Sequence, residues 1–199
     1  MKQTTCIDLL RHGETEGGAR FRGSINDPLS ELGWAQMWAA VESEAGWDHI
    51  ISSPLARCAD FAHALAEQHS ISVDLNERIK EMHFGAWEGR TAAQLMAIDP
   101  NALSRFWKNP LQHTPPQAEP LTAFEARVLS AWHNIVANHR EEKILLISHG
   151  GVMRVILCHI LQHPIQRLLE FEIGHAALRR VSIDSTRGGS YVVGDGSMF

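Results

Sequence analysis

The chain alternates short apolar runs with longer stretches in which apolar residues recur at helical spacing. Short apolar runs bounded by polar or turn residues predict buried strands, and a run that alternates apolar with polar residues predicts a half-buried strand. The predicted strands lie at residues 7–10, 49–51, 71–75, 143–147, 178–183 and 191–193. No internal repeat or low-complexity tract interrupts this pattern.

Predicted helices connect these strands. Ser30 is suited to cap the first helix. Ser53 and Pro54 are suited to begin the second helix, which places Arg57 on its first turn. A break in the third is expected before Pro100, because the residue that precedes a proline disfavours helix. The helical stretches are residues 30–44, 54–69, 91–109, 121–140 and 152–161.

Strands that alternate with helices favour an α/β fold. We expect one domain over residues 1–199, with a mostly parallel sheet and helices on both of its faces. Residues 110–120, which are rich in proline, are predicted to be an extended connection within that domain. In sheets of this kind ligands bind beyond the carboxyl ends of the strands, so the residues that follow the strands are the candidates for a site.

Charge and composition limit the partners. A formal net charge of −5, with no run of Lys or Arg, argues against a nucleic acid. The hydrophobic fraction of 44% is ordinary for a globular domain and argues against a membrane partner. A small anionic ligand stays possible, because a few arginines in a cleft suffice to bind it. We expect a monomer or a homodimer.

The N-terminal segment and the cysteines indicate the compartment. The first apolar run is broken by Asp8 and is too short for a signal peptide, so we expect a cytoplasmic protein. Cys6, Cys58 and Cys158 are odd in number and far apart, which argues against both a disulfide framework and a zinc cage. We expect three reduced cysteines, no metal and no cofactor.

Two predicted strands end in the same dipeptide. His12 and Gly13 follow the first strand, and His149 and Gly150 follow the most apolar one. If both strands are central, their carboxyl ends share an edge of the sheet and the two imidazoles face one cavity. A glycine after each histidine lets the backbone approach a ligand closely.

Two arginines are expected at the same edge of the sheet. Arg11 precedes His12, and Arg57 lies just after the second strand. Guanidinium groups match phosphate oxygens bidentately, so two arginines beside two histidines predict a site for a phosphoryl group.

Metal-free phosphoryl transfer also needs an acid for the leaving oxygen. Glu81, in the loop that follows residues 71–75, is the candidate acid. Glu14, Glu77 and Glu88 are other carboxylates near it in the sequence.

Five segments together resemble the histidine phosphatase superfamily, in its phosphoglycerate mutase-like branch. Residues 10–15 (LRHGET) resemble the signature of that family. The other four follow in the family's order, and the resemblance covers nearly the whole chain. They are residues 22–33 (RGSINDPLSELG), 52–57 (SSPLAR), 81–89 (EMHFGAWEG) and 148–151 (SHGG).

The resemblance implies a role for each candidate residue. His12 resembles the nucleophile that becomes phosphohistidine. One of its ring nitrogens must then be free of its proton, and we expect a backbone carbonyl to hold the proton on the other. Arg11, Arg57 and His149 resemble the groups that hold the phosphoryl oxygens. Glu81 resembles the proton donor, which later serves as the base that activates water. No metal or cofactor takes part in the chemistry that the family implies.

One segment departs from the family pattern. Many relatives carry an asparagine shortly after the signature threonine, where this chain has Glu16, Gly17 and Gly18. Either Arg22 or Ser24 is left to supply that phosphate contact, with the backbone of Gly23 and Gly150 at hand. Residues 16–23 (EGGARFRG) most resemble the α-ribazole phosphatase branch, which implies α-ribazole 5′-phosphate as the substrate, in assembly of the cobalamin nucleotide loop.

Three other functions stay open on the same residues. The first is a broad phosphatase of sugar phosphates or nucleotides. The second is a mutase that returns the phosphoryl group to a bound product, and the third is a non-catalytic phosphate-binding module. Trp87, Phe106 and Trp107 would wall a pocket for a flat base, although core packing is the favoured interpretation. His175 and Arg179 are not assigned to the site.

Overall fold

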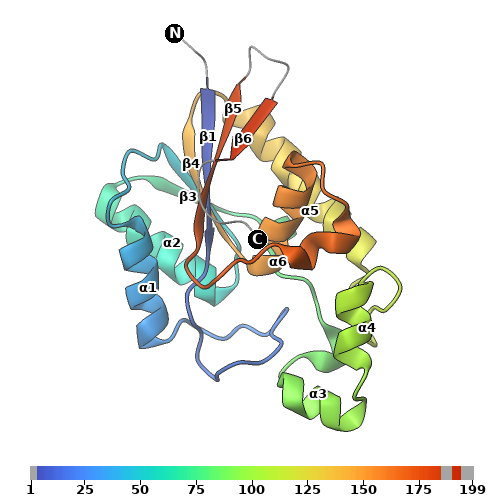
Figure 1. Cartoon of the computed structure of the whole chain (residues 1–199). Helices are drawn as coiled ribbons and strands as arrows, with labels where there is room; N and C mark the ends of the chain where they lie inside the picture. Colours follow the sequence, from blue (N-terminus) through green and yellow to red (C-terminus); the bar gives the residue numbers. More distant parts are fainter. Residues whose placement is uncertain (1–3, 185–189, 194–199) are drawn as a thin grey trace.

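The computed structural model describes residues 4–184 and 190–193, which form one six-stranded sheet with helices on both faces (Figure 1). The strand order is β3-β2-β4-β1-β5-β6. β3, β2, β4 and β1 run parallel, whereas β5 is antiparallel to both of its neighbours. The strands are β1 (Thr4–Arg11), β2 (His49–Ser52), β3 (Ser72–Leu75), β4 (Lys143–Ser148), β5 (Leu178–Asp184) and β6 (Ser190–Val193).

The pairing register aligns the ends of the central strands. Arg11, the last residue of β1, pairs with Ser148, the last residue of β4. Ser52, the last residue of β2, pairs with Ile147 of β4. The residues that follow these three strands therefore leave the sheet at the same edge, as the sequence predicts.

Alternating side chains of the strands build a hydrophobic core on each face of the sheet. In β4, Ile144 and Leu146 belong to one core, and Leu145 and Ile147 belong to the other. α1 (Glu31–Val41) and α2 (Ala56–His69) cover the second of these faces, and α5 (Leu121–Asn138) and α6 (Gly150–Ile160) cover the first (Figure 1). Burial on both faces explains why the β4 sequence is a continuous apolar run.

A helical hairpin and three short turns complete the described chain. α3 (Ala92–Ile98) and α4 (Ala102–Lys108) are separated at the predicted break before Pro100, and they project away from the sheet (Figure 1). The turns are the 3₁₀ helices η1 (Glu77–Ile79), η2 (Gly85–Trp87) and η3 (Ile165–Glu170), which the sequence pattern did not predict.

The predicted start of α2 was wrong. The helix begins at Ala56, and Leu55 is its N-cap residue without a side-chain cap. Ser53 stays outside the helix, where its hydroxyl contacts Nε2 of His149 at 2.8 Å. Arg57 still lies on the first turn, as predicted.

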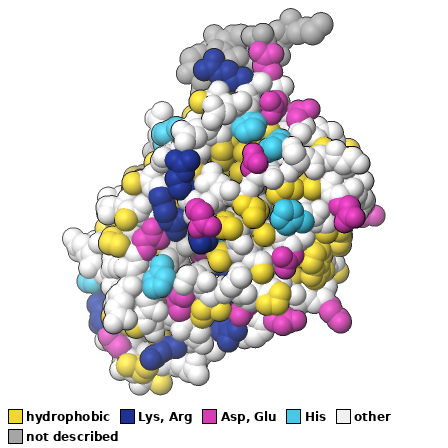
Figure 2. Space-filling model, turned by 180° about the vertical axis from the view of Figure 1, so that it is seen from behind, with side chains coloured by type: hydrophobic (Ala, Val, Ile, Leu, Met, Phe, Trp, Pro, Cys, Tyr) yellow, Lys and Arg dark blue, Asp and Glu magenta, His cyan; other side chains and the backbone are white. Residues whose placement is uncertain are grey.

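The surface shows no single dominant charge on the face seen from behind. Acidic and basic side chains are interspersed there with hydrophobic ones (Figure 2). In the described part of the chain, no helix combines the length and the apolar character that crossing a membrane requires.

Candidate active site

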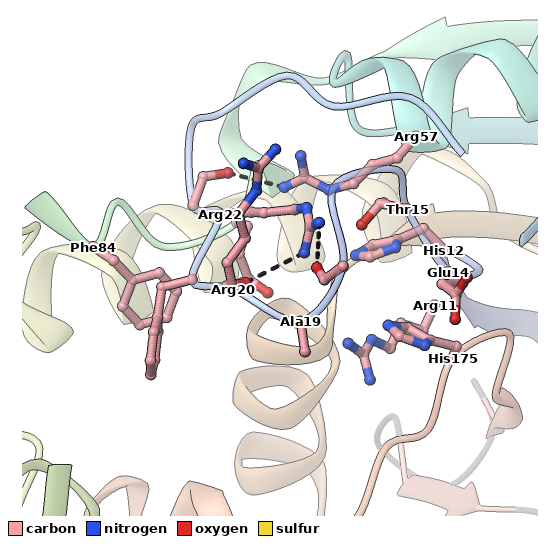
Figure 3. A pocket seen from close by; sticks show the side chains of 14 residues that line it. Arg11, His12, Glu14, Thr15, Ala19, Arg20, Arg22, Arg57, Phe84 and His175 are labelled. Carbon is pink, nitrogen blue, oxygen red and sulfur yellow. Dashed lines mark hydrogen bonds between the residues drawn. The ribbon is translucent and has the colours of Figure 1, made fainter. Parts of the chain in front are cut away.

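A cavity of about 390 Å³ opens beyond the carboxyl end of β1 (Figure 3). Its walls come from the segment after β1, from the first turn of α2, from the loop that carries Glu81, and from the segment before β5. The charged and imidazole side chains around it are Arg11, His12, Glu14, Arg20, Arg22, Arg57, Glu81 and His175. Basic groups outnumber acidic ones, so the cavity is suited to an anion.

His12 lines this cavity with a fixed tautomer. Its Nδ1 lies 2.7 Å from the carbonyl oxygen of Gly13. Because a carbonyl oxygen only accepts, Nδ1 carries the proton and Nε2 keeps a free lone pair. Burial, with the charges of Arg57 and Arg11, holds the pKa of His12 well below its usual value, so the ring is neutral at neutral pH.

His149 lies behind His12 and does not line the cavity. The two ring centroids are 5.2 Å apart, and His149 is fully buried. Nε of Arg57 donates to its Nδ1 at 3.3 Å, so the ring proton is on Nε2, which lies 2.8 Å from the Ser53 hydroxyl. Burial, followed by the charge of Arg57, keeps the pKa of His149 well below its usual value.

The expectation that both imidazoles face the cavity is therefore wrong for His149. The ring supports the guanidinium of Arg57 from behind, and the cavity side of that guanidinium is left to a ligand.

Arg57 joins three parts of the site. Its NH1 donates to the carbonyl of Ile25 at 2.6 Å and its NH2 to that of Gly23 at 2.9 Å, which anchors the loop after β1 to α2. The side chain is 1% exposed, and burial lowers its pKa. A buried guanidinium without a carboxylate partner is costly, and a bound phosphoryl group would supply the missing charge.

Arg11 presents a second guanidinium to the cavity. NH1 donates to the carbonyl of Ile173 at 2.6 Å, and Nε is buried with no hydrogen-bond partner among the described residues. Burial lowers the pKa of Arg11 to about 10, so the group is still charged at neutral pH.

Of the two candidates for the missing asparagine contact, only Arg22 lines the cavity. Its NH2 donates to the carbonyl of Glu16 at 2.6 Å, and its Nε donates to Asp27 at 2.8 Å. Ser24 turns away, because its backbone N–H and its hydroxyl both donate to Glu88.

The two glycines of the predicted site differ in position. Gly23 lines the cavity with a φ of +39°, and a Cβ there would lie 2.6 Å from the carbonyl oxygen of Met82. Gly150 lies at the start of α6, outside the cavity wall, where a Cβ would come within 2.9 Å of the Arg154 guanidinium. Gly23 therefore requires glycine, whereas at Gly150 the flexible Arg154 side chain could move to make room for a Cβ.

Glu81 lies in the loop between η1 and η2 and lines the cavity. Its carboxylate accepts hydrogen bonds from the backbone N–H of Met82 at 2.9 Å and of Gly151 at 3.1 Å. Gly151 is on the first turn of α6, where the helix dipole favours a negative charge. Of the other nearby carboxylates, Glu14 also lines the cavity, whereas Glu77 and Glu88 do not.

His175 lines the cavity, although the sequence pattern did not assign it to the site. Its ring centroid lies 5.9 Å from that of His12, and the N–H of the next residue, Ala176, donates to the His12 carbonyl. His175 precedes β5, which is antiparallel to β1, so the start of β5 meets the end of β1. The sequence predicts the strand at residues 178–183 but not its antiparallel pairing with β1, and that pairing is what brings His175 to the cavity.

Of the three aromatic residues considered as walls of a pocket, two are buried in the core and one is exposed. Trp87 and Phe106 are 6% and 5% exposed and pack in the core, as favoured. Trp107 is 54% exposed and lines no part of this cavity, so neither interpretation fits it. Among residues 4–184 and 190–193, no three His, Cys, Asp or Glu side chains gather in a way that could hold a metal ion.

The fold and the cavity together define an α/β protein whose basic cavity lies beyond the carboxyl ends of parallel strands. Residues 7–195 match the family model of the histidine phosphatase superfamily, branch 1. The chain belongs to this family.

Comparisons with curated proteins and solved structures agree with this assignment. The bifunctional protein Rv2228c of Mycobacterium tuberculosis is 32% identical over 185 residues, which are 90% of this chain but 48% of that protein, so the chain spans about half of that relative. A glucosyl-3-phosphoglycerate phosphatase of Mycolicibacterium vanbaalenii is 30% identical over 168 residues, which are 79% of this chain and 74% of the relative.

Two solved structures cover most of the chain. YhfR of Bacillus stearothermophilus superposes with a TM-score of 0.88 at 26% identity, over 98% of each chain. The α-ribazole phosphatase from Shigella flexneri superposes with a TM-score of 0.78 at 26% identity, over 90% of this chain and 91% of the other.

Proposed function

We propose that this chain is a metal-independent phosphomonoesterase that carries the phosphoryl group on His12. The observation that supports it best is the free Nε2 of a neutral His12, which shares one cavity with Arg11 and Arg57. A nucleophile with an available lone pair beside two guanidinium groups meets the first requirements of phosphoryl transfer.

In the first step, Nε2 of His12 attacks phosphorus while the bond to the leaving oxygen breaks. Arg11 and Arg57 bind the phosphoryl oxygens and stabilise the charge that develops on them. Glu81 gives its proton to the leaving oxygen, so the product alcohol leaves neutral. His149 acts by holding Arg57, and Arg22 takes the place of the asparagine contact of relatives.

In the second step, water attacks the phosphohistidine. The Glu81 carboxylate, which has already given up its proton, takes one from that water. The P–N bond breaks, its electron pair returns to Nε2, and inorganic phosphate is released. The same carboxyl group thus serves both steps.

For the substrate, we propose α-ribazole 5′-phosphate. The likeness of residues 16–23 to that branch and the structural likeness to the Shigella flexneri enzyme support it. A phosphorylated sugar acid is the rival, because the glucosyl-3-phosphoglycerate phosphatase is 30% identical. A mutase ranks lower, since the small α3–α4 hairpin leaves little chain for a lid that would exclude water.

The test is phosphate release from a panel of esters in the presence of EDTA. The panel holds p-nitrophenyl phosphate, α-ribazole 5′-phosphate, glucosyl-3-phosphoglycerate, fructose phosphates and nucleotides. We expect release from several and the highest kcat/KM with α-ribazole 5′-phosphate. The His12→Gln variant should form no phosphoenzyme.

Three results would redirect the proposal. If the protein hydrolyses none of these esters, the proposed phosphatase activity is wrong. A need for a bisphosphorylated primer, without release of phosphate, would replace it with a mutase. Unchanged function in His12→Gln would leave a phosphate-binding module.

A further inference from the structure

Arg127, on α5, binds the backbone of the segment that ends at Glu81. Its NH1 donates to the carbonyl oxygens of Arg78 and Lys80, both at 2.8 Å. Its NH2 donates to the carbonyl oxygen of Glu81 itself at 3.0 Å. One guanidinium thus satisfies three carbonyl groups of a four-residue stretch that lies outside any strand or α-helix.

Glu119 fixes the orientation of that guanidinium. Nε of Arg127 donates to Oε1 at 2.7 Å and NH2 donates to Oε2 at 2.9 Å, which is the bidentate arrangement of a strong ion pair. The two side chains are 23% and 18% exposed, so solvent screens the pair only partly. The guanidinium carbon of Arg127 lies over the Phe124 ring, 4.7 Å from the ring centroid.

Glu119 also holds the segment on the far side of Glu81. Its backbone N–H donates to the carbonyl of His83 at 2.9 Å, and its carboxylate accepts from the His83 N–H at 3.4 Å. The loop is therefore anchored on both sides of Glu81 by a single ion pair, while the Glu81 carboxylate is held at the N-terminus of α6 by Gly151.

We propose that Arg127, oriented by Glu119, is a positioning residue for proton transfer by Glu81. Arg127 does not line the cavity and is too occupied by its own partners to bind a substrate. Its role is to keep the backbone of Glu81 in place, so that the carboxyl group reaches the leaving oxygen within hydrogen-bond distance. This inference rests on the proposed function.

A role in proton transfer predicts dependence on the leaving group. An alkoxide needs a proton to leave, whereas p-nitrophenolate is a stable anion that leaves without one. The comparison uses kcat/KM, which contains the first phosphoryl transfer but not hydrolysis of the phosphohistidine. Arg127→Met should lower kcat/KM on the order of 10²-fold for the fastest alkyl ester of the panel, at the lower end of what general acids contribute. For p-nitrophenyl phosphate it should fall by less than about threefold, since no proton is needed.

Two further variants test the position of the guanidinium. Arg127→Lys keeps the charge, but one ammonium group cannot reach three carbonyls and a carboxylate together. Arg127→Lys should therefore also lose kcat/KM selectively for the alkyl ester, but by a smaller factor than Arg127→Met. Glu119→Gln should do likewise, because it leaves the guanidinium without its bidentate partner.

Arg167→Met is the matched control. Arg167 forms an ion pair with Glu170 at the same Nε–Oε1 distance of 2.7 Å but contacts no carbonyl of the Glu81 loop. It should leave kcat/KM unchanged for both esters. Thermal unfolding of every variant identifies any that fails to fold. If Arg127→Met fails to fold, the leaving-group comparison is made with Arg127→Lys and Glu119→Gln instead.

Glu81→Gln separates failure of this inference from failure of the proposed function. If Glu81→Gln loses the alkyl ester selectively but the Arg127 and Glu119 variants lose both esters equally, Arg127 is merely structural and the inference is overturned. If Glu81→Gln itself is not selective, the assignment of the acid, and with it the proposed mechanism, is overturned instead. Parallel selectivity in all of them supports the inference.

Discussion

At the scale of single residues, the two buried histidines of the site have opposite tautomers, and each is set by a neighbour with only one hydrogen-bonding role. The Gly13 carbonyl can only accept, so His12 keeps its proton on Nδ1. Nε of Arg57 can only donate, so His149 keeps its proton on Nε2. The first tautomer frees a nitrogen for attack, and the second turns His149 into a support for Arg57.

Ser53→Ala should therefore weaken both stability and activity. Ser53 is fully buried, and its hydroxyl is the partner of His149 Nε2. Its loss leaves the buried N–H with only the Cys58 sulfur, a weak acceptor at 3.8 Å, which costs about 1–3 kcal/mol of unfolding free energy. Urea unfolding measures that loss. KM should rise as Arg57 loses its fixed support, and an unchanged KM together with unchanged stability would contradict the assigned tautomer.

The residue scale also marks a limit of what the sequence can predict. The carbonyl partner of His12 was expected, and a local bond to Gly13 supplies it. The setting of His149 was not predictable, because it depends on Arg57 and Ser53, which are 92 and 96 residues away in the chain. Periodicity and motifs report nothing about such side-chain contacts.

At the scale of elements, the sheet edge was predictable because its signals are local. Apolar runs located β1, β2 and β4, and polar residues directly after each run indicated where the strands end. The place of β5 depends on its pairing with β1, which a local pattern does not fix, and His175 was missed with it. The 3₁₀ turns have too few residues to create a periodic pattern.

The packing of α1 against the segment after β1 yields a second prediction. A Cβ at Gly33 would lie 1.9 Å from the carbonyl oxygen of Glu14, so Gly33→Ala must displace backbone next to His12. Alanine favours helix over glycine by roughly 1 kcal/mol, but overpacking costs about 1–3 kcal/mol. We expect net destabilisation in urea unfolding and at least about a tenfold loss of kcat/KM.

Ala35→Gly in the same helix is the control for this substitution. Ala35 is exposed, so the change should cost about 1 kcal/mol through helix propensity alone and leave kcat/KM unchanged. If Gly33→Ala were as active and as stable as the parent chain, the close contact between α1 and Glu14 would not exist in solution.

At the scale of the whole molecule, a chain with a net charge of −5 keeps a cavity in which basic groups predominate. Concentrating Arg11, Arg22 and Arg57 in one hollow focuses a positive potential there, whatever the sign of the rest of the surface. Burial, together with the charges of Arg57 and Arg11, lowers the pKa of both buried histidines and keeps them neutral. The site is thus ready to bind an anion, and its stability is linked to pH.

The linkage predicts that the folded state loses stability as the pH falls below about 6.5. In the folded state the pKa values of His12 and His149 lie well below the usual value of about 6.5 for histidine. As the pH falls, the unfolded chain therefore binds protons at these two residues before the folded chain does, which favours unfolding. Each buried histidine contributes a slope of up to about 1.4 kcal/mol per pH unit. Urea unfolding at pH 7, 6 and 5 should show this decline.

A variant isolates one of the two histidines in that decline. His149→Gln should reduce the slope by up to about 1.4 kcal/mol per pH unit, even though it lowers stability at pH 7 by disturbing the buried bonds to Arg57 and Ser53. His63→Gln, which replaces an exposed side chain on α2, should leave the slope as it is. The hydrogen bonds from Arg20 and Arg22 lower the pKa of Asp27, which moves its titration away from this window. A stability that stays constant from pH 7 to 5 in the parent chain would mean that the two imidazoles are not held neutral, and the free Nε2 of His12 would then not be available for attack.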